Sequence, residues 1–403
     1  MRIQGTFKPL KDVLVIDLSH TLAGPFATMV LADLGARVIK IEPPAGDETR
    51  AWAPHVKGFS AYFASANRGK ESVVINLKLE EGRNVLYRLV RDADVVIENF
   101  RPGVRERLGV DPDTLFNINP KLVYCSIKGF GLDDTPYRDL PAYDIIIQAL
   151  SGLMGSTGEE GRPPVRVSFA LFDIMTAYLA VINILAALKA RNEGLIKGPT
   201  YIEIPMYDAA VFSMAYIPVI YLMTGKEPKR MGSAHPSIVP YQAFRGSDGK
   251  YFILAAANDR LWVKACEALG MHELAQDPKF RTNPDRVRNR DELVKLLSEV
   301  FSRKPRDYWV RLFRERGVPV APVYSVGEVF KDPHIMKHGV VAKLPHPTLG
   351  EVPQLTYPAV INGERPMSKK HPPLKGEHTD KVLRELGFSD KEIKELRAKG
   401  VVT

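Results

Sequence analysis

The sequence contains very little cysteine. Of its 403 residues only two are cysteines, Cys125 and Cys266, and they lie far apart in the chain. This excludes a framework of disulfide bonds and a zinc site built from cysteine ligands. The N-terminal segment also lacks an apolar run of about 7 to 15 residues followed by a small-residue cleavage site. We therefore expect a cytoplasmic protein without a signal peptide.

Several widespread binding motifs are missing as well. The chain has no G-x-x-x-x-G-K-[ST] phosphate loop, no H-E-x-x-H zinc helix and no G-x-G-x-x-G dinucleotide fingerprint. These absences argue against a P-loop protein, a metal-dependent enzyme and a nicotinamide-dependent enzyme. Zinc-finger spacings and RNP-like aromatic patterns are absent too, so we do not expect a nucleic-acid partner.

Hydrophobic runs long enough to span a membrane are also lacking. Three polar residues interrupt the apolar stretch 171–188, and the stretch 209–223 contains Pro218 and falls short of a span of about 20 residues. We interpret both stretches as buried helices of a large core and expect no membrane partner.

The charge balance is mildly basic. Lys and Arg number 56 and Asp and Glu number 47, which gives a net charge of +9. A hydrophobic content of 45% and a charged content of 26% are typical of a soluble globular protein. The length suggests two or three domains. Such a surplus is compatible with nucleic acid, a membrane surface or a phosphorylated small molecule as partner, and the missing motifs and spans favour the third.

The first 130 residues alternate between strand-like and helix-like periods. We expect a strand at 13–18, a helix at 25–34 that begins with Pro25, and a strand at 37–42. Similar patterns predict strands at 72–77, 94–98 and 122–127 and helices at 80–91 and 103–108. This alternation predicts an α/β fold with a mostly parallel, doubly wound, Rossmann-like sheet.

The composition changes near residue 225, where a polar, turn-rich linker begins. We therefore expect residues 1–224 to form the first part of a large domain, residues 225–330 a smaller α+β domain, and residues 331–403 a separate C-terminal segment. The patterns predict strands at 239–244 and 251–255 and helices at 259–269, 290–302, 305–316 and 380–399.

Asp173 is the most informative single residue. It lies where a strand-like segment gives way to the long apolar helix. A carboxylate at this place either caps the helix or is a reactive group held at the positive helix end, and the residues alone leave both readings open. Asp208 has similar surroundings, and we interpret it as a helix cap.

Two loops follow predicted strands and are candidates for binding an anionic ligand. The turn 19–25 offers free backbone N–H groups at a helix start, although a plain tight turn explains it equally well. The segment 99–107 directly follows a strand, and ligands of open α/β sheets bind at the carboxyl ends of strands. Its arginines either pair with phosphates or form a solvated helix face. Phe100 and Arg101 together suit a single nucleotide moiety.

Four stretches carry a resemblance to a known family: DLSHTLAGPFATMVLADLGARVIKIEPPAGDETR, ENFRPGVRERLG, YDIIIQALSGLMGSTGE and FDIMTAYLAVINILAAL. They resemble the class III CoA-transferase (CaiB/BaiF) family, which includes carnitine, bile-acid and formyl-CoA transferases and 2-methylacyl-CoA racemases. The resemblance extends in order from about residue 10 to the C-terminus.

This resemblance implies a Rossmann-like large domain to which residues 331–403 return, and two chains interlocked as a homodimer. It implies CoA or acyl-CoA as a substrate, with no permanently bound cofactor and no metal, and a thioester site between domains. Asp173 falls on the family's nucleophile. CoA contacts fall on Leu22, Ala23, Ala66, Asn67, Arg68, Asn99, Phe100, Arg101 and Arg107. The thioester site falls on Tyr143 and Asp144, and its covering loop on Gly232, Ser233, Ala234 and His235.

The implied function is CoA transfer from an acyl-CoA to a carboxylic acid through an aspartyl mixed anhydride and an aspartyl-CoA thioester. The alternative within the family is α-proton abstraction by a racemase. The racemases carry a histidine where this chain has Tyr143, a poor base near neutral pH, which favours transfer. A non-catalytic CoA-binding protein is the remaining alternative. Leu22 replaces a glutamine of formyl/oxalate transferases, so we do not expect oxalate specificity.

Overall fold

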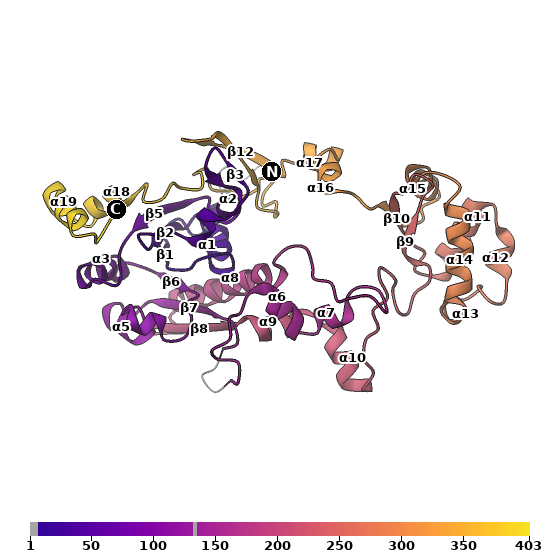
Figure 1. Cartoon of the computed structure of the whole chain (residues 1–403), viewed down its shortest axis with the longest axis horizontal. Helices are drawn as coiled ribbons and strands as arrows, with labels where there is room; N and C mark the ends of the chain where they lie inside the picture. The colour runs from indigo at the N-terminus through magenta and orange to yellow at the C-terminus, as the bar shows by residue number, and fades with distance from the viewer. Residues whose placement is uncertain (1–6, 132–134) are drawn as a thin grey trace. The chain divides into compact units, whose positions relative to one another are not determined.

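The computed structural model describes residues 7–131 and 135–403, which form two compact units (Figure 1). The first unit contains the described residues up to Leu153, Val167–Thr224 and His334–Thr403. The second contains Met154–Arg166 and Gly225–Pro333.

The first unit is built on a sheet of six parallel strands. Its order, β5-β2-β1-β6-β7-β8, reverses direction between β1 and β6, as in dinucleotide-binding doubly wound sheets. The structure confirms the predicted α/β fold with a parallel sheet. The strands are β1 (Leu14–Asp17), β2 (Arg37–Glu42), β5 (Lys70–Val74), β6 (Val95–Glu98), β7 (Val123–Lys128) and β8 (Thr200–Pro205).

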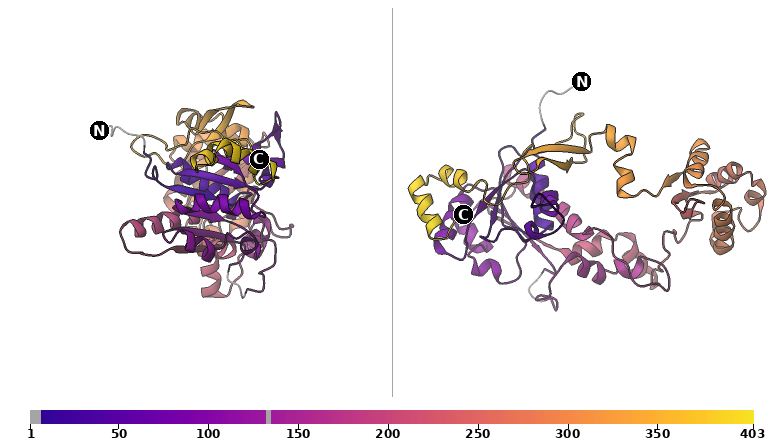
Figure 2. Two further views of the ribbon diagram at one scale, coloured as in Figure 1. Left: turned by 90° about the vertical axis from the view of Figure 1, so that its left-hand side faces the viewer. Right: turned by 45° about the horizontal axis from the view of Figure 1, so that its top comes forward.

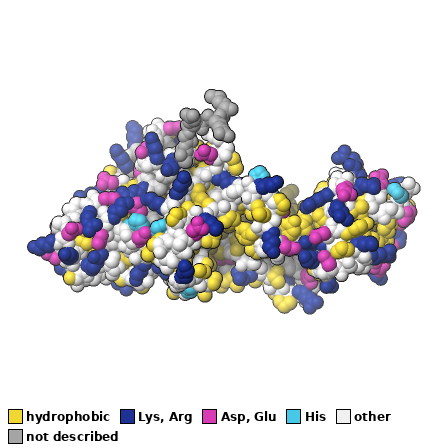
Figure 3. All heavy atoms as spheres, turned by 90° about the horizontal axis from the view of Figure 1, so that it is seen from above, with side chains coloured by type: hydrophobic (Ala, Val, Ile, Leu, Met, Phe, Trp, Pro, Cys, Tyr) yellow, Lys and Arg dark blue, Asp and Glu magenta, His cyan; other side chains and the backbone are white. Residues whose placement is uncertain are grey.

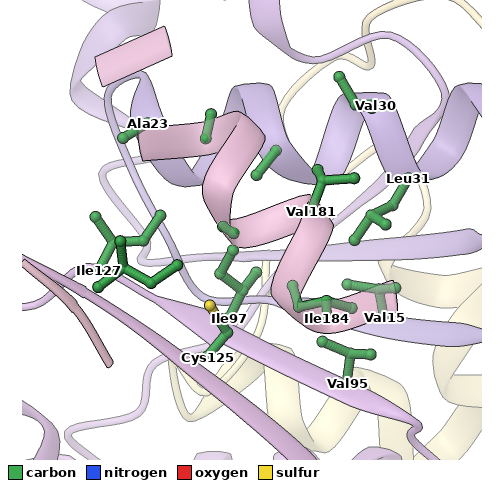
Figure 4. Packing of buried hydrophobic residues seen from close by; sticks show 14 of the residues in the cluster. Val15, Ala23, Val30, Leu31, Val95, Ile97, Cys125, Ile127, Val181 and Ile184 are labelled. Atoms are coloured by element: carbon green, nitrogen blue, oxygen red, sulfur yellow. The ribbon is translucent and has the colours of Figure 1, made fainter. Parts of the chain in front are cut away.

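One face of this sheet is covered by α1 (Ala23–Asp33) and the long helix α8 (Leu171–Asn192). Figure 4 shows Val181 and Ile184 of α8 packed against Val95 and Val15 of the central strands. Helices α6 (Asp144–Leu150) and α9 (Met206–Ser213) join the same core. Burial of these aliphatic side chains is what fixes the start of α8 over the carboxyl ends of the strands.

The other face of the sheet carries a second core. It is formed with α3 (Glu80–Arg91), α5 (Pro112–Ile118), α18 (Thr379–Glu385) and α19 (Asp390–Ala398). The C-terminal helices lie beside the sheet in both Figure 1 and Figure 2, and Val402 bridges Ile75 at the end of β5. The segment after His334 thus belongs to the first compact unit.

The predicted single helix at 380–399 is wrong, because it is two helices. Gly387, with φ of +86°, ends α18 in a left-handed conformation that favours glycine. Ser389 then starts α19 with a capping box in which its hydroxyl accepts from the N–H of Glu392.

Among the described residues, α8 is the one helix long and apolar enough to cross a membrane, and α9 with α10 (Tyr216–Thr224) is a bent pair that together passes the same criteria. The inward side of α8, from Phe172 to Leu188, is buried in the first core. This packing is that of a core helix.

The second unit is a three-stranded antiparallel sheet with helices around it. The strands lie in the order β11-β10-β9, and Trp262, Phe301 and Phe313 are buried at the centre of its core. Its elements are β9 (Tyr241–Arg245), β10 (Tyr251–Ala255), β11 (Val320–Pro322), α11 (Asp259–Leu269), α12 (His272–Gln276), α13 (Asn283–Arg288), α14 (Arg290–Phe301), α15 (Arg306–Glu315) and α16 (Val326–Val329).

The segment Met154–Arg166 lies with the second unit, whereas the sequence analysis included it in the first domain. Two contacts explain the difference. Glu159 forms a β-bridge with Met231, and the Arg230 guanidinium donates to the carbonyl of Arg162 over 2.7 Å.

The remaining elements are short apart from α10. They are η1 (Glu48–Ala51), β3 (His55–Val56), β4 (Phe59–Ser60), α2 (Ala61–Ala66), α4 (Val104–Arg107), α7 (Leu153–Ser156), α17 (Pro333–Lys337) and the hairpin β12 (Val341–His346) with β13 (Gly350–Leu355). On the face drawn in Figure 3, Lys and Arg side chains are interspersed with Asp and Glu. The positive charge is therefore not gathered into one patch on that face.

Candidate active site

The turn between β1 and α1 is fixed by the end of the neighbouring strand β6. The Asn99 amide accepts from the N–H of His20 over 2.9 Å and donates to the carbonyl of His20 over 2.8 Å. Thr21 has a φ of +69°, and its hydroxyl donates to Glu48. A Cβ on Gly24 would lie only 2.2 Å from the Cβ of Ser19, so the turn needs glycine there.

A buried network of charges lies beneath this turn. The Lys70 ammonium donates to Asp17 over 2.9 Å, to the carbonyl of Pro25 over 2.9 Å and to Asn67 over 2.8 Å. Burial lowers the pKa of Lys70 to about 8, against the opposing effect of Asp17. Because Pro25 is in the first turn of α1, these bonds hold the start of that helix.

The start of α1 offers two free donors. Within the described residues, the N–H groups of Ala23 and Gly24 have no acceptor, whereas the N–H of Phe26 donates to the carbonyl of Leu22. Free N–H groups at the positive end of a helix favour a developing negative charge.

A cavity opens at this place, where the strand order reverses. Its walls bring together residues far apart in sequence, among them Ala23, Asn99, Phe100, Tyr143 and Asp173. Three cations, Arg101, Lys128 and Arg138, also line it. The cavity thus combines a carboxylate, an aromatic surface, backbone donors and positive charge.

Asp173 does not cap its helix. It is the third residue of α8, and the N-cap position is held by Ala170, which makes no side-chain hydrogen bond. The cap comes from Asp144, whose Oδ1 accepts from the N–H of Phe172 over 2.7 Å and of Asp173 over 3.4 Å. Of the two readings of Asp173, the structure therefore excludes the cap.

Burial and the negative charge of Asp144 raise the pKa of Asp173 to about 7. Asp144 itself is buried behind the cavity wall, and its second oxygen accepts from Gln148. A carboxylate with a raised pKa and access to a cavity is a stronger nucleophile than an exposed one.

Asp208 is not a cap either, which corrects the sequence interpretation. It is the third residue of α9, where Pro205 occupies the N-cap position without a side-chain hydrogen bond. Its side chain is exposed and lies in a shallow groove near Asn183 and Phe212 rather than in the cavity of Asp173.

A second cavity adjoins the first. Both share His20, Glu48 and Phe100 in their walls. The second one reaches over the carboxyl ends of β2 and β5, where Leu77 and Lys78 line it.

The centroids of the His20 and Phe100 rings lie 6.0 Å apart. Burial and the charge of Lys40 lower the pKa of His20. His20 is therefore neutral near neutral pH.

The structure brings six of the expected residues to the first cavity and leaves others out. Ala23, Asn99, Phe100, Arg101, Tyr143 and Asp173 line it. Leu22 is buried beside it, and Arg107 is exposed outside both cavities.

Ala66, Asn67 and Arg68 are buried away from these two cavities. Asn67 binds Lys70, and Arg68 is paired with Asp33 over 2.5 Å. The side chains of Asn67 and Arg68 thus have internal partners, and a direct contact of these three residues with CoA stays a prediction.

The expected covering loop, Gly232–His235, lies in the second unit. The Ser233 hydroxyl accepts from the N–H of Ala243, and the carbonyl of His235 accepts from the Arg290 guanidinium over 2.8 Å. Its part in the site stays a prediction.

Several residues at or near these cavities were not singled out from the sequence, among them Tyr62, Glu48, Lys78 and Arg138. Lys78 follows β5 as Asn99 follows β6, so the rule about strand ends would have found it. Tyr62 has no such signal. Burial and the negative charges of Asp173 and Asp144 raise the pKa of Tyr62, which places its phenol within electrostatic reach of both carboxylates.

Comparison with known proteins shows the family of this chain. Residues 10–379 match CoA-transferase family III. The chain is 40% identical to a human succinyl-CoA:glutarate CoA-transferase over 99% of this chain and 91% of the relative. It is 42% identical to an acetyl-CoA:oxalate CoA-transferase of Acetobacter aceti over 83% of this chain and 86% of that relative.

A solved structure is similar too. A CAIB/BAIF family protein from Brucella suis superposes with a TM-score of 0.86 at 40% identity, covering 94% of this chain and 99% of the other. The chain belongs to CoA-transferase family III. It is accordingly an enzyme that transfers CoA from an acyl-CoA to an acid.

Proposed function

We propose that the protein transfers CoA between two carboxylic acids with Asp173 as the nucleophile. The observation that carries this proposal is the place of Asp173. It lines the cavity at the reversal of strand order, with its pKa raised to about 7 by burial and Asp144. The family membership supports CoA transfer as the reaction, and the place of Asp173 in the cavity supports this residue as the nucleophile.

The two adjoining cavities suit the two ends of CoA. The adenosine moiety occupies the cavity over β2 and β5, where Lys78 offers a charge to its phosphates. Phe100 and His20 lie in both walls, so the pantetheine arm passes them. Arg101 lines the first cavity beside Phe100 and pairs with the diphosphate. The thioester then reaches Asp173.

The first half of the reaction converts the aspartate into a thioester. A carboxylate oxygen of Asp173 attacks the thioester carbonyl carbon, the C–S bond breaks, and CoA leaves as a thiolate. The product is a mixed anhydride. The thiolate then attacks the carbonyl carbon of Asp173, so the donor acid leaves as a carboxylate and an aspartyl-CoA thioester remains.

The second half repeats these steps in reverse order with the acceptor acid. Its carboxylate attacks the aspartyl thioester and releases the thiolate, which then attacks the acceptor's carbonyl carbon and frees Asp173. One thioester is broken and one is formed, so the reaction needs no ATP and has no net proton change. In this proposal the free N–H groups at the start of α1, those of Ala23 and Gly24, stabilise the developing oxyanion.

Dicarboxylic acids are the proposed substrate class. The relatives act on succinyl-CoA and glutarate, or on oxalate, and each of these acids has two carboxylates. Since Leu22 replaces the glutamine of formyl/oxalate transferases, we propose a longer diacid rather than oxalate.

We also propose that the active protein is a homodimer. The end of α9 and helix α10 expose large apolar side chains, with Phe212 79%, Leu222 79% and Met223 81% accessible in the single chain. Contiguous exposed apolar surface of this kind marks a protein interface. Sedimentation at micromolar concentration tests this, and a monomer would contradict it.

The test of the function uses succinyl-CoA, labelled glutarate and deuterated water. We expect labelled glutaryl-CoA from the wild type and from Asp208→Ala, and none from Asp173→Ala. Mass spectrometry of the Asp173 peptide after incubation with succinyl-CoA alone should show the CoA adduct. Deuterium at the α-carbon without dependence on an acceptor would contradict transfer and favour a racemase. Tight CoA binding without either signal would indicate a binding protein.

A further inference from the structure

A dicarboxylate brings a charge to the cavity that the chemistry at Asp173 does not use. Only one of its carboxylates reacts, and the other is ionised at neutral pH. Enclosing an unpaired carboxylate away from water is unfavourable, so a selective site must supply a cation to it. The question is which cation of this cavity is available.

Three cations line the cavity of Asp173, and they differ in their partners. The ammonium of Lys128 is paired with Glu203 over 2.7 Å, so its charge is already balanced. Arg101 directly follows Phe100 at the end of β6, on the side where the two cavities meet. This position suits the phosphates of CoA.

Arg138 is the third cation. Its guanidinium makes no ion pair or hydrogen bond within the described residues, and its side chain is exposed. It lies in the short segment before Tyr143, which lines the same cavity and immediately precedes Asp144. An arginine that has no such partner among the described residues and lines the same cavity as Asp173 is available to an anionic substrate.

Arg138 makes no ion pair with Asp173. The raised pKa of Asp173 comes from burial and from the charge of Asp144. A guanidinium in contact with Asp173 would lower its pKa and weaken it as a nucleophile. Arg138 is therefore available to the second carboxylate of a substrate without lowering the pKa of Asp173.

We propose that Arg138 binds the non-reacting carboxylate of the substrate and makes the enzyme selective for dicarboxylic acids over monocarboxylic ones. This inference rests on the proposed function. The planar guanidinium matches a carboxylate through two parallel N–H···O bonds. The donor succinyl-CoA is the monothioester of a diacid and also ends in a free carboxylate. The same arginine therefore recognises the donor and the acceptor in turn.

The experiment compares two acids of equal length, glutarate and pentanoate, as acceptors with succinyl-CoA as donor. For the wild type we expect a far lower KM for glutarate than for pentanoate. In Arg138→Gln the KM for glutarate and for succinyl-CoA should each rise roughly 10- to 100-fold, the loss expected for one charge-assisted pair. The KM for pentanoate should not rise, and Arg138→Lys should recover part of the glutarate affinity.

The matched control is Arg91→Gln, an exposed arginine at the end of α3 on the amino-terminal edge of the sheet, which should leave all three KM values unchanged. An equal rise for glutarate and pentanoate in Arg138→Gln, or no rise for either, would overturn the role of Arg138 while leaving CoA transfer in place. So would a wild type that prefers pentanoate. Failure of the wild type to transfer CoA to either acid would overturn the proposed function itself.

Discussion

The starts of α8 and α9 look alike in sequence and differ in chemistry. Each helix has an aspartate as its third residue, Asp173 and Asp208, and neither aspartate caps its own helix. Asp173 lines a cavity and has a pKa raised to about 7, whereas Asp208 is exposed. The helix position alone therefore does not make a carboxylate reactive.

The difference comes from the elements that pack against each helix. At α8, Asp144 from α6 accepts the free N–H groups of the first turn and adds a negative charge beside Asp173. At α9 the acceptor at the helix start is neutral, because the N–H of Tyr207 donates to the backbone carbonyl of Gly129 over 3.0 Å. A charged cap raises the pKa of a neighbouring carboxyl, whereas a backbone carbonyl brings no negative charge to the helix start.

The largest expected effect separates the two aspartates by activity. Asp173→Ala removes the nucleophile, so we expect kcat for CoA transfer to fall by at least about 1,000-fold. Asp208→Ala should change kcat by less than about twofold. Steady-state formation of glutaryl-CoA measures both. Equal losses of kcat in the two variants would contradict the proposed difference between Asp173 and Asp208.

The next effect concerns stability and its dependence on pH. Since the folded-state pKa of Asp173 is raised from 3.8 to about 7, its contribution to stability is fully present below about pH 4 and is lost as the pH rises through 7. Asp173→Asn should therefore be more stable than the wild type at pH 8, by about 1–3 kcal/mol.

This gain should shrink to a small remainder near pH 4, where the folded carboxyl is protonated and the unfolded one, with a pKa of 3.8, is about half protonated. The exposed Asp208→Asn should change the free energy of unfolding by less than about 0.5 kcal/mol at either pH. Urea denaturation at the two pH values measures these differences. A gain for Asp173→Asn that is the same at pH 4 and pH 8 would mean that packing, not ionisation, is its cause.

A third effect tests the turn at His20, which lines the cavity of Asp173 and not the groove of Asp208. Asn99→Ala removes both bonds to the backbone of His20, and we expect KM for acyl-CoA to rise about 5- to 30-fold, since two hydrogen bonds hold the turn. The kcat should change less. A fall in kcat with an unchanged KM would show that Asn99 acts on the chemistry and does not position the turn.

The smallest expected effect comes from the charge of the cap. Asp144→Asn keeps an oxygen that accepts from the N–H of Phe172 but removes the negative charge beside Asp173. The pKa of Asp173 should fall, so the acid limb of kcat/KM should move to lower pH while kcat at pH 8 changes by less than about threefold. An acid limb that stays in place would assign the raised pKa of Asp173 to burial alone.

Much of the fold was predictable because the spacing of apolar residues in the sequence matches the helices and strands of the structure. The helix at 80–91 and the strand at 37–42 match their predicted bounds, since their apolar residues repeat at helical and strand spacing. The break between α18 and α19 was missed because amphipathic spacing continued across Gly387.

The site was predictable to the extent that it follows strand ends. Asn99 and Phe100 were found in this way, and Lys78 was available to the same rule. For Asn67 and Arg68, only the structure shows that they lie away from both cavities and bind Lys70 and Asp33. Tyr62 carries no local signal, since its nearness to Asp173 depends on how α2 packs.

The sequence by itself determined the alternation of strands and helices, the place where α8 begins, and the family. Each depends on residue spacing or on residue order, which the unfolded chain already contains. Only the tertiary structure decided that Asp173 lines a cavity with a raised pKa while Asp208 is exposed, and that Asp144 caps the helix of Asp173. Burial and the approach of a like charge set the pKa of a carboxyl, and both exist only after distant segments have packed together.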